Sequence, residues 1–99
     1  MWKEMLDSAN YNKYALPLTG GTMTGKLIIN NTTDIVAGTA NSGVLLIGPP
    51  TGAHVAIDGN EIMAKGSGTT TSTLHINNEG GLVQIGSGGL RVNGKITAN

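Results

Sequence analysis

A short repeated pattern limits what this chain can fold into. From Leu27 onward, an aliphatic residue, any residue and a second aliphatic residue are followed by Asn, Asp or Gly. Alternation with a period of two is typical of a β-strand with one buried face, and Asn, Asp and Gly favour turns. The pattern occurs at 27–30, 45–48, 55–58, 74–77, 83–86 and 90–93. The chain is therefore expected to be all-β, a Gly-rich meander of short strands.

Two turns in this meander have the composition of tight hairpins. Asp58-Gly59 follows the strand expected at 55–57, and Asn93-Gly94 follows the strand expected at 90–92. Asp-Gly and Asn-Gly are the dipeptides preferred by two-residue hairpin loops, whose central residues both take positive φ. Hairpins are expected at both positions.

Large apolar side chains are scarce for a chain that has to bury such strands. The 99 residues include 16 Gly, one Trp and no Phe. Strands of about four residues leave exposed edges that act as templates for pairing with other chains. Three copies around one axis need only small aliphatic side chains pointing inward, so an intertwined trimeric β-fibre, similar to a triple β-helix, is the expected architecture. A small Gly-rich barrel is the alternative.

The residues expected in the shared core of such a trimer are the inward-pointing members of the strands. They are Leu27, Ile29, Leu45, Ile47, Val55, Ile57, Leu74, Ile76, Val83, Ile85, Leu90, Val92 and Ile96. The sequence leaves open whether the strands pair within one chain or between chains.

The first segment follows a different pattern. Apolar residues between Trp2 and Ala9 recur at helical spacing, and Pro17 lies beyond the end of that pattern. Two or three helical turns are marginal alone in water, so a short helical or extended segment that needs packing partners is expected. The chain accordingly divides into a linker segment at 1–25 and a β-repeat domain at 26–99.

Charge and composition argue against several classes of function. Six Lys and Arg residues balance six Asp and Glu residues, without the basic stripe that binds nucleic acid backbones. No apolar run approaches the roughly 18 residues of a membrane span, and the absence of Cys removes disulfides and thiolate metal sites. No nucleic acid partner, membrane insertion or cofactor is expected.

Two stretches resemble the shafts of bacteriophage tail fibres. Residues 8–25 read SANYNKYALPLTGGTMTG, like the linker and first shaft segment of many such fibres. Residues 80–86 and 88–96 are similar to repeat units of the same shafts. The resemblance implies a homotrimeric shaft of the virion tail, synthesised in the bacterial host cytoplasm, with other tail-fibre or baseplate domains as partners. Such a shaft holds a receptor-binding tip away from the virion.

Residues 20–26 share the glycines and the lysine of a phosphate-binding loop. Leu27 stands where that loop needs Ser or Thr to reach Mg²⁺, and a β-prone run follows where a helix is required. A turn is therefore the expected structure at this position.

His54 and His75 are weak candidates for a metal site. In a trimer each would form a ring of three imidazoles, but neither belongs to the paired H-x-H pattern that holds metal on the axis of some fibres of this kind. Alternation sends both outward if Val55 and Leu74 face the core. Solvated surface histidines without a metal are expected.

Asp58, Glu61 and Glu79 are candidates for a general acid and base. They stand in turns or at strand starts among small polar residues, where nothing is expected to desolvate them or to shift their pKa values apart. They are interpreted as solvated turn carboxylates, and no catalytic residue is assigned.

Three functions from different classes follow from these observations. The first is a structural shaft, and the second is a module whose Asn- and Thr-rich turns bind a host cell-surface glycan. The third is a fragment of a depolymerising enzyme, which would need paired carboxylates at glycosidase separation. The structural shaft is favoured, and the chain is not expected to be an enzyme.

Overall fold

The computed structural model describes residues 5, 7, 9 and 15–98 of the chain. The chain divides into two units, 1–30 and 31–99, whereas the sequence predicts a boundary after residue 25. The short helix expected around Trp2 and Leu6 lies outside the described residues. The described part of the first unit contains no helix or strand, and a turn in which Gly20 N–H donates to Pro17 O at 2.9 Å precedes the glycine-rich stretch.

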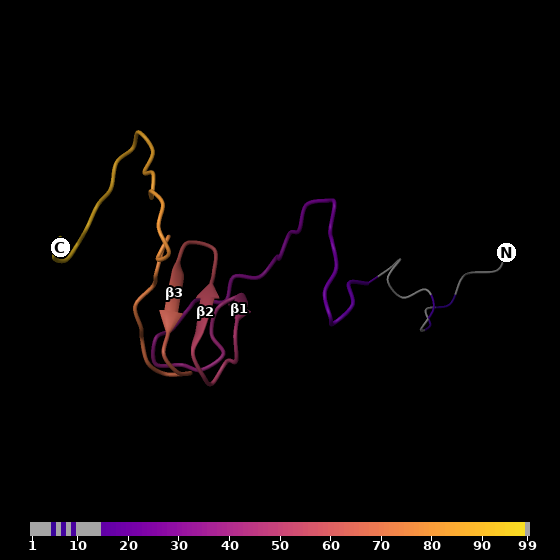
Figure 1. The fold of residues 1–99 in the computed structure, drawn as a ribbon. Coiled ribbons are helices and arrows are strands. Elements are labelled where there is room, and N and C mark those ends of the chain that lie inside the picture. The colour runs from indigo at the N-terminus through magenta and orange to yellow at the C-terminus, as the bar shows by residue number, and fades with distance from the viewer. Residues whose placement is uncertain (1–4, 6, 8, 10–14, 99) are drawn as a thin grey trace. The chain divides into compact units, whose positions relative to one another are not determined.

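The second unit contains a three-stranded antiparallel sheet in the order β1-β2-β3 (Figure 1). β1 spans Leu45–Ile47, β2 spans His54–Ile57 and β3 spans Ile62–Lys65. The described part of the chain has no helix, so the prediction of a β-rich fold is confirmed. These strands do not close into a barrel, because β1 and β3 remain at opposite edges of an open sheet.

The hairpin between β2 and β3 forms where the sequence predicts it, but by a different mechanism. Asp58 Oδ1 accepts hydrogen bonds from the backbone N–H groups of Asn60 and Glu61, both at 2.9 Å. Asp58 N–H donates to Glu61 O at 3.1 Å and closes the loop. Neither Gly59 nor Asn60 has a positive φ, so the turn is not of the primed type. The Asp58 side chain shapes this turn.

The loop that precedes β1 covers one face of the sheet. Ala56 in β2 is fully buried and Ile35 of the loop is 5% exposed, and they are the only buried apolar residues in the described part of the chain. A Cβ placed on Gly43 would lie 3.1 Å from Ile35 Cγ1 and 3.5 Å from Ala56 Cβ, so the chain packs closely here. The apolar core formed by the described residues therefore consists of two side chains.

Polar contacts hold the loop on this covered face. Lys65 of β3 is 1% exposed, and its ammonium group donates to Val36 O at 3.1 Å and to Thr39 O at 2.8 Å. The Ser42 hydroxyl accepts from Val36 N–H at 2.9 Å and donates to Val36 O at 3.1 Å. Because a buried polar group costs free energy unless it is hydrogen-bonded, the loop and β3 depend on each other.

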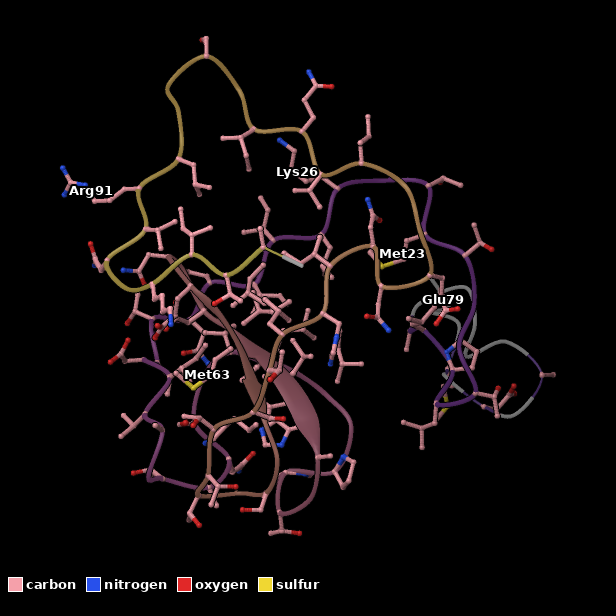
Figure 2. All side chains as sticks on the ribbon, turned by 60° about the vertical axis from the view of Figure 1, so that its left-hand side comes forward. Met23, Lys26, Met63, Glu79 and Arg91 are labelled. Carbon is pink, nitrogen blue, oxygen red and sulfur yellow. The ribbon has the colours of Figure 1, made fainter. Side chains whose placement is uncertain are left out.

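The other expected strands do not form in the described chain. No ladder includes residues 27–29, 74–76, 83–85 or 90–92, and no strands pair across Asn93-Gly94. The hairpin expected at Asn93-Gly94 is therefore wrong for a single chain. Each run has about four residues, which is too few for a strand without a packing partner. The Arg91 side chain projects outward from the last of these segments (Figure 2).

Gly48 and Gly59 provide a matched test of the loop geometry. Gly48 has a φ of +114°, and a Cβ on it would lie 2.8 Å from Ala53 O, whereas Gly59 has open space around it and no positive φ. We expect Gly48→Ala to lower the free energy of unfolding by roughly 1–3 kcal/mol and Gly59→Ala to change it by less than about 1 kcal/mol. Urea denaturation followed by circular dichroism measures both, and equal losses would contradict the geometry.

Candidate interaction surface

The second face of the sheet is made of aliphatic side chains. Cross-strand partners in an antiparallel sheet point to the same side, and the register gives two rows of three such partners. The first row is Leu45, Ile57 and Ile62, and the second is Ile47, Val55 and Ala64. We name these six residues the open face.

The open face remains accessible to water in the single chain. Leu45 is 42% exposed, Ile47 is 61% exposed and Ile62 is 57% exposed. The other three residues are half-buried, and none of the six carries a charge or a hydrogen-bonding group. Contiguous apolar surface of this kind marks interaction sites on soluble proteins.

None of the residues expected in a trimer core belongs to the core of the single chain. Leu45, Ile47, Val55 and Ile57 lie on the open face. The others lie outside the sheet and are each at least 39% exposed; they are Leu27, Ile29, Leu74, Ile76, Val83, Ile85, Leu90, Val92 and Ile96. The structure brings only the first four together within one chain.

Sequence reasoning missed two members of the open face and the apolar residue that packs beneath the sheet. Ile62 and Ala64 continue the alternation of period two after the hairpin, so the register of that hairpin could have identified them. Ile35 stands alone in a loop, where no periodic pattern identifies it.

His54 is buried, so the expectation that it faces solvent is wrong. It is 5% exposed and shares the covered face with Ala56. Its Nδ1 lies 2.9 Å from Gly52 O, and its Nε2 is buried without a hydrogen-bond partner in the described part of the chain. The alternation along β2 is as predicted, but the chain's own core takes His54 and Ala56 and leaves Val55 and Ile57 on the other side.

His75 is exposed, and its Nδ1 lies 3.1 Å from Asn78 Oδ1. Neither His54 nor His75 belongs to a group of possible metal ligands among the described residues.

Asp34, Asp58 and Glu61 bring carboxylate oxygens within 4.8 Å of one another. Asp58 uses both of its oxygens on the backbone, because Oδ2 accepts from Ile35 N–H at 2.9 Å in addition to the hairpin bonds of Oδ1. This engagement ties the hairpin to the covering loop. The cluster therefore has a structural role in the hairpin.

The two hairpin carboxylates have pKa values shifted in opposite directions. Hydrogen bonds from the backbone of Asn60 and then of Ile35 lower the pKa of Asp58 below its ordinary value of 3.8. Desolvation, followed by the charge of Asp58, raises the pKa of Glu61 above its ordinary value of 4.5. These opposite shifts contradict the expectation that nothing moves the two pKa values apart. Asp58 and Glu61 are half-buried in the turn, whereas Glu79 lies on an exposed turn (Figure 2).

Comparisons of the chain with known protein families, with curated proteins and with solved structures find no match. Within the described residues, no helix has the length and apolar character needed to span a bilayer.

Asp58→Asn tests the hydrogen bonds that the Asp58 carboxylate accepts in the hairpin. The lowered pKa means that the carboxylate of Asp58 contributes stability that is fully present above pH 3.8 and is lost as the pH falls through its folded-state value. We expect Asp58→Asn to lower the melting temperature at pH 7, with the difference from wild type narrowing below pH 3.8. Thermal melts from pH 7 to pH 2 measure this, with Glu79→Gln as a neutral control; a constant difference would contradict it.

Glu61→Gln should have the opposite effect on the melting temperature. The raised pKa of Glu61 means that its ionised form weakens the fold, by an amount that grows as the pH rises from 4.5 through the folded-state value. We expect Glu61→Gln to raise the melting temperature at pH 7 and to leave it unchanged well below pH 4.5. The same series of melts tests this, and a destabilised variant at pH 7 would show that Glu61 makes a favourable contact when charged.

Proposed function

We propose that this chain is a structural shaft segment of a bacteriophage tail fibre, in which three copies bury their open faces in one common core. The shaft holds a host-receptor-binding tip away from the virion. The open face is the observation that carries the proposal, because it is an ordered aliphatic surface that the chain itself leaves in water.

The energetics of the open face support association. Fully burying a Leu or Ile side chain contributes about 1.5–3 kcal/mol, so covering each half-exposed residue of the face contributes roughly 1 kcal/mol. Leu45, Ile47 and Ile62 each retain about half of their surface in the single chain. Three copies multiply this gain without desolvating a charged or polar side chain on the face.

Two features of the sequence support a number of three copies. The stretches at 8–25 and 80–96 resemble shafts that are homotrimers. Small side chains such as Ala64 suit a crowded axis, and the tail from 73 to 98 supplies further exposed aliphatic residues at a spacing of two. A threefold arrangement uses both of these features.

The open face lacks the chemical groups that bind glycans. Sugar recognition relies on hydrogen-bonding groups and aromatic rings, and the face has neither. Trp2, Tyr11 and Tyr14 are the chain's aromatic residues and lie outside the described ones. The aliphatic face thus supports contact with protein better than contact with carbohydrate.

The mass in solution tests the proposal. Light scattering coupled to size exclusion should give three times the chain mass of 10.1 kDa. Because association and burial are one event, the trimer should resist dissociation on dilution. A folded chain of single mass at micromolar concentration would overturn the proposal.

Ile47→Asp tests which surface is buried in the assembly. Ile47 is 61% exposed in one chain, so the substitution should cost a monomer only about 0.5 kcal/mol, but it places an unpaired charge in the shared core of a trimer. We expect Ile47→Asp to abolish the trimer, while Thr51→Asp in an exposed loop and Ile47→Val retain it. A trimer of unchanged mass for Ile47→Asp would show that another surface forms the core.

A further inference from the structure

The outer edge of β3 carries the beginning of a fourth strand. Gly66 N–H donates to Thr70 O at 3.1 Å, Lys65 pairs with Thr71 in an isolated antiparallel bridge, and Ser72 N–H donates to Ala64 O at 2.9 Å. Figure 1 shows the chain turning back beside β3 after that strand ends. The bond between Ser72 and Ala64 is the last of this ladder among the described residues.

The register of this bridge fixes what the next residues would meet. An antiparallel ladder that pairs Lys65 with Thr71 brings Thr73 opposite Met63 and Leu74 opposite Ile62. Ile62 belongs to the open face, and partners share a side, so Leu74 would join that face. Ile76, two residues further on, would point the same way, but the register sets it opposite Asn60 of the hairpin loop, beyond the start of β3 at Ile62.

The sequence of the segment has the alternation that this position requires. Leu74 and Ile76 alternate with Thr73 and His75, so the aliphatic members match the open face and the polar members match the covered side. In the single chain Leu74 is 39% exposed and Ile76 is 62% exposed, and neither residue is in a ladder.

We propose that residues 73 and 74 complete a fourth strand on β3, and that residues 75 and 76 continue this strand past the hairpin, when a second copy of the chain packs on the open face. This inference rests on the proposed function and specifies the surface that the copies share. The widened face then consists of the six open-face residues together with Leu74 and Ile76. The partner that it fits is another copy, because the added residues are aliphatic like the face that they extend.

The coupling has a physical reason. In a single chain, ordering residues 73–76 costs backbone entropy and adds two apolar side chains to a face that is still in water. When a second copy covers the face, the same side chains become buried and the new ladder bonds are protected from water. Strand completion and association therefore favour each other.

A disulfide tests the register, since the chain has no Cys of its own. Ile62→Cys with Leu74→Cys places the thiols on one side of a directly paired position, where the Cα atoms are about 5.5 Å apart, a distance that suits a disulfide. Ile62→Cys with Thr73→Cys is the matched control, because its thiols would point to opposite sides. In the assembled protein we expect the first pair to form an intrachain disulfide at least tenfold faster than the control.

The same oxidation is repeated on chains that the additional Ile47→Asp substitution keeps dissociated, where the rate should fall to that of the control pair. Equal rates for the two pairs in the assembly would overturn the register, and an equally fast reaction in the dissociated chain would overturn the coupling. A disulfide between chains would show that a neighbour supplies the fourth strand, which also overturns the proposal.

A second comparison needs no disulfide. Leu74→Asp should weaken association at least tenfold, whereas Thr73→Asp on the other side of the strand should leave it unchanged. Light scattering on the unmodified chain separates the two failures. A single-chain mass overturns the proposed function together with this inference, but a trimer without the intrachain disulfide overturns this inference alone.

Discussion

The backbone of this chain cannot cover the aliphatic side chains that its repeats place along it. Three strands of three or four residues give a sheet with two faces, and the loop before β1 reaches only one of them. The apolar side chains that this loop buries are its own Ile35 and Ala56 of β2. The open face and the aliphatic residues from Leu74 to Ile96 remain exposed in the single chain. This exposed aliphatic surface is what the proposed assembly would bury.

The contacts that hold one copy together are accordingly polar. Lys65 fixes the loop by donating to two carbonyl groups, and Asp58 fixes both the hairpin and the start of the same loop with its two oxygens. Directed bonds of this kind specify a geometry where apolar burial is too small to do so. The local fold therefore presents the open face in a defined shape, although only two apolar side chains are buried among the described residues. In the proposed assembly, apolar burial would be the dominant stabilising term between copies.

The periodic sequence pattern predicted the structural features that depend on residues close together in the sequence. The β-rich class and the hairpin after β2 follow from alternation and from Asp58-Gly59. The sequence pattern did not predict which face of the sheet the loop buries. Hydrophobicity favours Val55 and Ile57 for burial, whereas the loop can approach the sheet closely only over the small side chain of Ala56. The buried position of Lys65 depends on the carbonyl groups of Val36 and Thr39, which lie far away in the sequence and which no period encodes. The strands expected beyond residue 73 lack partners in one chain, and a pattern cannot reveal where a partner comes from.

The edges of the sheet are less available for contact with another chain than its open face is. β1 has three residues and is followed by Gly48 and Pro49-Pro50, and proline cannot donate to a ladder. β3 is followed by the segment at 70–72, which already occupies part of its outer edge. Short edge strands and proline are the devices by which natural sheets avoid open-ended edge pairing. In the proposed trimer, copies would meet through the open face and form a closed set around an axis, whereas copies that met through their edges would form an unlimited fibril.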